Sequence, residues 1–270
     1  MPNLVADLKN NDSKQNAESL IIEQKLNSLF YEKPKINEEA KFINLVLSKN
    51  GYNTERVGLH ASAIITSDNE FCYREQVLSL FYKQRQGEQT NIKLKRIFEE
   101  GNAIHEKWQR LFIRGGIAML QDLDRTRNID KYNLSYTPDA IVKIGKFTYV
   151  VEIKSVNTYQ FKNMKSHQSG KKQLMFYMLL SGINKGFVLA EDKNTQEFKV
   201  FVYDYDKEVV LPFIERLEAI QTYKKQFKEE KKIVKRICDN STCKRASKCP
   251  MRDACFNIGM GRIKLWNIIK

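Results

Sequence analysis

Two carboxylates and a lysine interrupt an apolar stretch near the middle of the chain, SYTPDAIVKIGKFTYVVEIKSV. Asp139, Glu152 and Lys154 stand on two predicted β-strands where apolar side chains would be safer. Gly145 and the residue after it fit a two-residue type II′ turn, because glycine readily adopts the positive φ of the first central position. The sequence therefore predicts a β-hairpin that carries two acids and an amine.

The turn also predicts the register of this hairpin, in which Ala140 faces Val151 and Asp139 faces Glu152. Directly opposed residues have Cβ atoms about 4.5–5.5 Å apart, so the two carboxylates would repel each other. Lys154 shares the face of Glu152, because side chains alternate along a strand. The alternative is a solvated sheet face on which Lys154 simply neutralises Glu152.

A divalent cation between the carboxylates would turn their repulsion into binding. Magnesium is typically held by one or two carboxylates, by waters and by substrate phosphate. Such an ion orients water and stabilises charge on the phosphate. Lys154 beside it would stabilise the pentavalent phosphorane or position the nucleophile. The hairpin thus favours phosphodiester hydrolysis.

A long amphipathic helix is predicted upstream, over residues 91–114, with His105 on its apolar face. Gly101 lies one turn earlier and is expected to allow close approach to a sheet. A lone histidine on an apolar face is more often a packed core residue than a metal ligand. The acids at Asp139 and Glu152 favour the ligand here.

A second helix, predicted near residues 171–180, carries Gln173 and Tyr177 one turn apart. Alone, this spacing is ordinary helix patterning, since both residue types are common on helix surfaces. Lys171 and Lys172 flank Gln173 and are suited to neutralising phosphates without reading sequence.

The order of these motifs resembles that of the PD-(D/E)XK nuclease superfamily, and in particular its RecB-like branch. Pro138-Asp139 and then Glu152-Ile153-Lys154 resemble the superfamily signature. The segment GNAIHEKWQRLF resembles the helix motif of the branch, in which a histidine is a metal ligand. The segment KKQLMFYMLLSG resembles its Q-x-x-x-Y motif, which contacts DNA near the metal.

The resemblance implies a catalytic set gathered from two helices and the hairpin: His105, Asp139, Glu152, Lys154, Gln173 and Tyr177. His105, Asp139, Glu152 and the backbone carbonyl of Ile153 would hold Mg²⁺ or Mn²⁺, and Lys154 would assist the attack of water. The implied DNA contacts come from the second helix: Lys171, Lys172, Gln173 and Tyr177.

Five cysteines are present, and Cys238, Cys243, Cys249 and Cys255 crowd near the end while Cys72 stands far upstream. In a reducing compartment such a cluster is more typical of a metal site than of disulfides. The segment CPMRDAC resembles the Cys-Pro-x4-Cys ending of the iron–sulfur members of the same branch. These include the CRISPR-associated Cas-four exonucleases and the AddB subunit of bacterial end-resection machines.

A [4Fe–4S] cluster needs four thiolates. The resemblance implies Cys72, Cys249 and Cys255 as three of them, with Cys243 as the fourth and Cys238 as its alternative. The gap between Cys243 and Cys249 is longer than in the family. A Cys₄ zinc site uses the same thiolates and is the rival, since Cys238 and Cys243 have knuckle-like spacing. Either metal would clasp the tail to the part around Cys72.

The chain is strongly basic, with 46 Lys and Arg against 32 Asp and Glu and a formal net charge of +14. Such an excess favours a polyanionic partner, most often nucleic acid, although a solvated basic surface is the alternative. Basic residues cluster between Lys224 and Lys248. Tyr159, Phe161 and His167 follow the hairpin in a polar loop and are expected to stack on unpaired bases.

The predicted elements give an α/β fold, a restriction-endonuclease-like core with a mixed central sheet flanked by helices. Residues 1–17 are expected to be frayed. Besides the elements above, we predict helices near 20–31, 38–47 and 211–236 and strands at 186–191 and 197–205. The predicted division is an N-terminal helical segment (1–60), a nuclease core (61–236) and a Cys-rich tail (237–270) that packs back on Cys72, all in a single compact unit.

The sequence thus predicts a metal-dependent DNA exonuclease that prefers single strands and acts in replication, recombination or end processing, in the manner of a phage or mobile-element protein. DNA with free ends would be its partner, together with proteins of those pathways. A CRISPR adaptation nuclease that trims spacers and a catalytically idle DNA-binding scaffold are the alternatives. No apolar run reaches the roughly 18 residues of a membrane span, and the N-terminus lacks a signal-peptide layout. A soluble, cytoplasmic protein is therefore expected.

Overall fold

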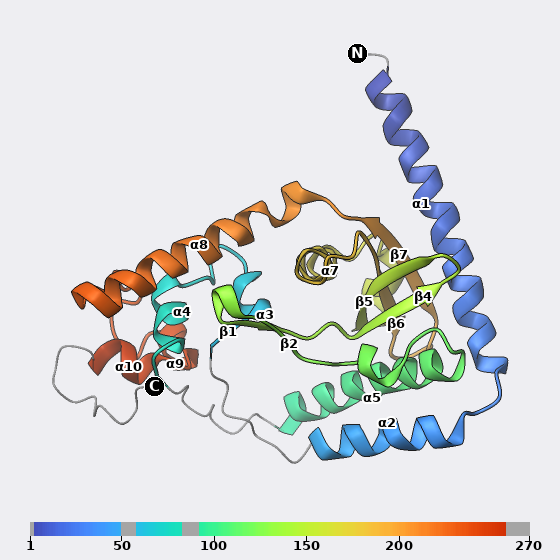
Figure 1. The fold of residues 1–270 in the computed structure, drawn as a ribbon, viewed down its shortest axis with the longest axis horizontal. Coiled ribbons are helices and arrows are strands. Elements are labelled where there is room, and N and C mark those ends of the chain that lie inside the picture. Colours follow the sequence, from blue (N-terminus) through green and yellow to red (C-terminus); the bar gives the residue numbers. More distant parts are fainter. Residues whose placement is uncertain (1–2, 50–57, 83–91, 258–270) are drawn as a thin grey trace. The chain divides into compact units, whose positions relative to one another are not determined.

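The computed structural model describes residues 3–49, 58–82 and 92–257, and the chain divides into two compact units (Figure 1). The first unit comprises Met1–Tyr52, Lys93–Thr126 and Thr137–Val210, and the second comprises Asn53–Ile92, Arg127–Tyr136 and Leu211–Lys270. These boundaries differ from the predicted division at residues 60 and 236. The reason is that strand pairing and tail packing join segments that are far apart in the chain.

The predicted hairpin is present in the first unit with the predicted register. β4 (Ala140–Ile144) pairs antiparallel with β5 (Phe147–Val156), and Ala140 lies opposite Val151. Gly145 has a φ of +61°, which a glycine adopts without strain. Continued by one residue, this register sets Asp139 opposite Glu152.

The hairpin belongs to a four-stranded mixed sheet with the order β4-β5-β6-β7. β6 (Lys185–Asp192) runs parallel to β5, and β7 (Phe198–Asp204) runs antiparallel to β6. A parallel neighbour requires a crossover connection, and here it contains α6 (Thr158–Asn163) and α7 (Gln168–Ser181). The predicted mixed sheet, its two later strands and the helix near 171–180 are confirmed.

The two faces of this sheet are covered by different helices (Figure 1). α5 (Ile92–Arg114), the predicted long helix, buries Trp108 and Phe112 in one core with Ile153 of β5. Since side chains alternate along a strand, Glu152 and Lys154 of β5 point to the opposite face. That face belongs to α7.

α7 approaches the sheet closely because one residue of β6 is a glycine, which has no side chain to obstruct the helix. A Cβ on Gly186 of β6 would lie 2.8 Å from a methyl carbon of Leu174 and 2.9 Å from the sulfur of Met178. Gly182, with a φ of +68°, ends the helix. The polar side chains of α7 are thereby held over those of β5.

The N-terminal segment is helical. It contains α1 (Asn3–Ser28), the 3₁₀ turn η1 (Leu29–Tyr31) and α2 (Ile36–Lys49), and the first unit also contains η2 (Leu120–Asp122). The prediction that residues 1–17 are frayed is wrong from Asn3 onward, because no Gly or Pro interrupts the helix. Ile22 and Leu26 anchor it in the core. Glu23 accepts a hydrogen bond of 2.9 Å from the backbone N–H of Val200 on β7.

The second unit contains a small three-stranded sheet in the order β1-β3-β2. The elements of this unit, helices included, are β1 (Leu59–His60), α3 (Ala61–Ile64), α4 (Tyr73–Ser79), β2 (Arg127–Ile129), η3 (Asp130–Tyr132), β3 (Leu134–Tyr136), α9 (Lys244–Lys248) and α10 (Arg252–Asn257). α8 (Lys207–Glu230) begins in the first unit and continues in the second. The helix predicted at 211–236 ends early because Lys231 has a φ of +56°.

The cysteine-rich tail packs on α4 and on the loop before it. Arg245 donates to the carbonyl oxygens of Asn69 at 2.8 Å and Phe71 at 2.9 Å. Arg74 of α4 donates to the carbonyl oxygen of Val234 at 2.7 Å. These arginine side chains, together with the packing of Leu78 and Tyr82 against Met251, hold the segments together. Within the described parts of the chain, every helix is too short or too polar to cross a membrane.

Candidate active site

His105 of α5 and Asp139, just before β4, are in contact. His105 Nδ1 lies 3.1 Å from Asp139 Oδ1, and Asp139 Oδ2 accepts a hydrogen bond of 2.7 Å from the backbone N–H of Ile153. The carbonyl oxygen of Asp139 accepts a further bond, of 2.7 Å, from Gln109 Nε2. Sequence reasoning missed Gln109, although its position one turn after His105 was the available signal. Asp139 is therefore fixed from three sides.

Glu152 is buried and only half satisfied. It is 1% exposed, and its Oε1 lies 2.5 Å from Lys154 Nζ. Its Oε2 is also buried and has no hydrogen-bond partner among the described residues. An unpartnered carboxylate oxygen away from water is costly. A cation at this oxygen would remove that cost.

Burial and mutual charge shift the proton affinities of this group. Burial, and then the charge of Asp139, raise the pKa of Glu152 to about 8, although Lys154 and His105 oppose the rise. Burial lowers the pKa of His105, but the charge of Asp139 and its hydrogen bond outweigh burial, so this pKa is raised. Burial also lowers the pKa of Lys154, which Glu152 more than reverses. Glu152 thus favours a proton or a bound cation, and the pKa shifts of His105 and Lys154 favour their charged forms.

A hydrogen-bonded chain runs from Lys154 into α7. Lys154 Nζ donates to Gln173 Oε1 at 3.1 Å, and Gln173 Nε2 donates to the hydroxyl oxygen of Tyr177 at 3.2 Å. Tyr177 is 2% exposed, and burial raises the pKa of its phenol. In this arrangement Tyr177 orients Gln173, and Gln173 orients Lys154.

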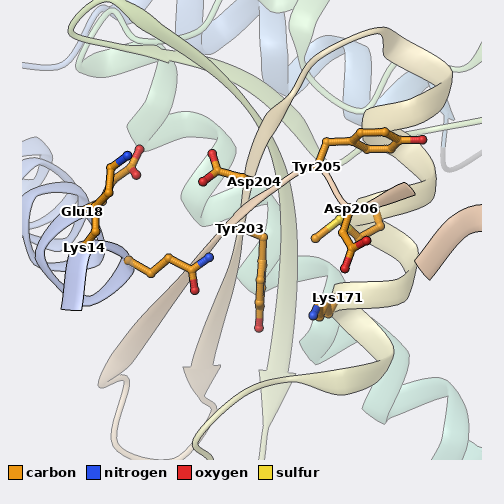
Figure 2. A pocket seen from close by; sticks show the side chains of 9 residues that line it. Lys14, Glu18, Lys171, Tyr203, Asp204, Tyr205 and Asp206 are labelled. Atoms are coloured by element: carbon orange, nitrogen blue, oxygen red, sulfur yellow. The ribbon is translucent and has the colours of Figure 1, made fainter. Parts of the chain in front are cut away.

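The two lysines of the predicted DNA-binding set do not share this face of α7. Lys171 Nζ lies 5.4 Å from the centre of the Tyr203 ring. Lys171 lines a cavity of about 300 Å³ together with Tyr203 and Asp206 (Figure 2). Lys172 is exposed. Gln173 is thus the member of the set that reaches Lys154 directly.

The three predicted base-stacking residues have different environments. Tyr159 is 80% exposed. Phe161 is buried beneath the ammonium of Lys199, which lies 4.5 Å from its ring centre, so its predicted stacking on DNA is wrong. His167 caps the N-terminus of α7.

Among the described residues, no group of three or more His, Cys, Asp or Glu side chains has the arrangement of a metal site. In the hairpin cluster the cause is visible, because Lys154 occupies one oxygen of Glu152 and His105 occupies one of Asp139. The donor types nevertheless fit Mg²⁺ or Mn²⁺, which prefer oxygen ligands and, for Mn²⁺, accept an imidazole. The unpartnered Oε2 of Glu152 is the feature that best matches a missing cation.

The five cysteines lie in the second unit, and none forms a disulfide. Cys72, Cys238, Cys249 and Cys255 line one cavity of about 20 Å³, roughly the space of one water. Cys243 does not line it, since its Sγ caps α9 by accepting from the backbone N–H of the third residue on, at 3.4 Å. The lining thus includes Cys238, the alternative fourth ligand, and Cys243 is its hydrogen-bonded neighbour.

Charged side chains of α4 contact these thiols. Arg74 Nε donates to Cys255 Sγ at 3.1 Å, and Cys249 Sγ lies 3.6 Å from Glu75 Oε2. Burial raises the pKa of Cys72, and burial together with Glu75 raises that of Cys249 to about 12. Four thiols around one cavity match the ligand type and number of a metal centre bound by cysteine, without having the arrangement of one among the described residues.

Three solved structures are similar to this chain. The LHK-Exo complex with dAMP is 15% identical, with a TM-score of 0.46, and 64% of this chain covers 92% of that one. An alkaline exonuclease (LHK-Exo) from Laribacter hongkongensis has the same identity and coverage, with a TM-score of 0.43. SSO0001 is 14% identical, with a TM-score of 0.36, and 68% of this chain covers 84% of that one. No family model and no curated protein sequence matches. Similarity at this level identifies no function, so function must be argued from the chain's own side chains.

Proposed function

We propose that this chain is a metal-dependent nuclease that hydrolyses phosphodiester bonds of DNA, working from the ends of single strands. The observation that carries the proposal is the buried, unpartnered Oε2 of Glu152, opposite Asp139 and beside Lys154. Two acids, an imidazole and an ammonium at one point of a sheet form a site for a hard cation and a phosphate. The net charge of +14 suits a polyanionic substrate.

His105, Asp139, Glu152 and the Ile153 carbonyl would hold Mg²⁺ or Mn²⁺. When bound, the ion lowers the pKa of a water and stabilises negative charge on the phosphate. Lys154 adds a second positive charge, directed by Gln173, for the oxygen that becomes more negative during hydrolysis.

Gln109 and the backbone N–H of Ile153 keep Asp139 in place while the phosphate is attacked. Tyr177 does the same for Gln173. Because the phenol of Tyr177 is buried and its pKa is raised, it stays protonated at neutral pH.

The test is cleavage of labelled DNA with Mg²⁺, Mn²⁺ or EDTA. Cleavage should need a metal and should be abolished in Glu152→Gln. Glu39→Gln is the matched control, because Glu39 pairs with Arg114 outside the site. Metal-independent cleavage, or full activity in Glu152→Gln, would show that the site is wrong. If the wild type binds DNA but never cuts it, and Glu152→Gln binds DNA as well, the scaffold alternative is favoured.

The need for a free end and the preference for single strands are tested with separate substrates. Linear single strands should be degraded to mononucleotides or short products. Circular single strands should survive because an exonuclease needs an end, and blunt duplexes should survive because the proposed enzyme prefers single strands. Cutting of the circle would replace the exonuclease by an endonuclease and leave the metal chemistry intact.

We also propose that the tail carries a [4Fe–4S] cluster held by Cys72, Cys238, Cys249 and Cys255. Support comes from the four thiols that line one cavity and from the absence of disulfides among them; the cavity, of about 20 Å³, would have to widen to admit the cluster. The cluster would clasp the tail to α4, a structural role. Zinc on the same thiolates is the rival.

Anaerobic purification with iron, sulfide and zinc analysis separates the two. A brown protein that contains iron and sulfide supports the cluster. A colourless protein with stoichiometric zinc supports the rival, and a colourless protein without metal would refute both.

A further inference from the structure

The N-terminus of α7 carries a histidine that the proposed catalytic roles leave unused. His167 is the N-cap residue, and its Nδ1 accepts a hydrogen bond of 3.0 Å from the backbone N–H of Gly170. Cap residues are usually Ser, Thr, Asp or Asn, which satisfy the same N–H with a smaller side chain. The imidazole ring therefore adds a second nitrogen, Nε2, that capping does not require.

The cap fixes which ring nitrogen carries the proton. Because Nδ1 accepts, the neutral ring has its hydrogen on Nε2. Burial, and then the charge of Lys154, lower the pKa of His167, so this neutral form persists near pH 7. Among the other described residues, none accepts a hydrogen bond from Nε2. The ring thus offers one donor that the described part of the chain does not use.

The ring also lies beside the catalytic strands. A Cβ on Gly170 would be 2.8 Å from His167 Nδ1 and 3.2 Å from Val188, and Val188 is the neighbour of Glu152 in the sheet. His167, Gly170 and Gln173 follow one another at helical spacing, and Gln173 bonds to Lys154. The donor of His167 therefore stands on the same face of the sheet as Lys154.

A DNA strand brings more than one phosphate to such a site. Lys154 already contacts Glu152 and Gln173, which leaves one of its three N–H donors for a phosphate. A neighbouring phosphate needs another donor. A neutral imidazole can donate without being drawn toward the acids of the metal site, as a second ammonium would be.

We propose that the Nε2–H of His167 binds a phosphate oxygen of the DNA strand, at the phosphodiester next to the one hydrolysed. This inference rests on the proposed nuclease function. It makes His167 a substrate-positioning residue, distinct from the metal ligands and from Lys154.

The variant His167→Asn separates the two tasks of the ring. Asparagine is a good N-cap, so the thermal stability should stay unchanged, but its amide is too short to replace the Nε2–H. With Ca²⁺ replacing Mg²⁺ to prevent turnover, the Kd for a labelled single strand should rise about tenfold, as expected for one hydrogen bond to a charged group. His167→Asp also caps, and its charge should weaken binding further.

The control is His60→Asn. His60 caps α3 in the second unit in the same manner, accepting from the backbone N–H of Ser62 at 3.4 Å. This variant should bind DNA as the wild type does. An equal loss in both variants would mean that exchanging a capping histidine is itself harmful, which would overturn the assignment to His167.

A methylphosphonate scan identifies the contacted phosphate. Replacing one phosphate at a time by a neutral methylphosphonate should weaken binding of the wild type at each contacted phosphate, and the position next to the hydrolysed phosphodiester should cost His167→Asn nothing. A purely structural role of His167 cannot produce this pattern.

Wild-type binding by His167→Asn, with Glu152→Gln inactive, would refute the inference and leave the nuclease intact. If the wild type neither binds nor cuts DNA, the proposed function and the inference fall together.

Discussion

Replacing Glu152 by Gln should make the metal-free protein more stable. The carboxylate is 1% exposed, and Oε2 lacks a partner among the described residues. Burial and Asp139 raise the pKa of Glu152 from 4.5 to about 8, so near pH 7 the folded protein keeps a proton on this acid. Glutamine mimics that neutral form. Near pH 7, Lys154 therefore faces a neutral side chain in the wild type and in Glu152→Gln alike.

The size of the effect follows from the cost of the extra proton. In the unfolded chain Glu152 loses its proton near pH 4.5, and in the folded chain only near 8. Across the gap from 4.5 to 7, at about 1.4 kcal/mol per pH unit, the cost is about 3.5 kcal/mol as an upper bound. The sign follows as well. Since the folded state binds the extra proton, wild-type stability should fall as the pH rises from about 4.5 to 8, and Glu152→Gln should lose this slope.

The assay is urea unfolding in EDTA, followed by Trp108 fluorescence in a Trp266→Phe background, because the chain has two tryptophans. Trp108 lies in the core of the first unit and reports its unfolding. Mg²⁺ or Mn²⁺ should stabilise the wild type and have little effect on Glu152→Gln, since a ligand that binds only the folded state shifts its stability.

Glu191 provides the matched control, because it is equally buried but fully bonded. Its oxygens accept from Trp108 Nε1 at 2.6 Å and from Lys107 Nζ at 2.5 Å. Glu191→Gln should therefore cost about 1–3 kcal/mol, as for other broken buried hydrogen bonds. If both variants lose stability, or if wild type and Glu152→Gln show parallel pH curves, Glu152 is not an uncompensated acid and the argument for a cation fails.

Three further predictions concern catalysis, packing and the tail. Lys154→Met should lower kcat by roughly 100-fold or more with little change in DNA affinity, measured under single-turnover conditions, because its charge acts mainly in the transition state. Gly186→Ala should cost about 2 kcal/mol in urea unfolding, since its Cβ would meet atoms at 2.8–2.9 Å. Gly101→Ala, whose Cβ would meet only an oxygen at 3.6 Å, should be neutral or stabilising. Cys238→Ser should lower the metal content of the purified protein, whereas Cys243→Ser should not.

The hairpin and its acids could be predicted because their causes are local. Gly145 sets the turn, the turn sets the register, and alternation then places Glu152 and Lys154 on one face. His105 was singled out not by its helical phase alone but by the acids at Asp139 and Glu152 and by the resemblance of its segment to a family motif. Local rules were sufficient wherever turn geometry or periodicity alone decided a position.

The remaining features depend on packing between segments that are distant in the chain. The burial of Tyr177 depends on how closely α7 approaches β6, which Gly186 permits. Gly101 was expected to allow close approach, yet a Cβ there would make only an ordinary contact. Cys238 lines the cavity, whereas the Sγ of Cys243 caps α9, and this difference depends on how the tail folds. No pattern within a single element encodes such choices.

Two buried glutamates on neighbouring strands show why Glu152 has the better claim to a function. Glu191 lies on β6 and joins α5 to the sheet through Trp108 and Lys107, so its burial is compensated within the fold. Glu152 lies on β5, shares one oxygen with Lys154 and leaves the other without a partner among the described residues. A glutamine or an apolar residue would stabilise the same strand more. A residue that costs stability where a better one would fit is expected at sites of function, and a cation bound at Oε2, as proposed, would offset that cost.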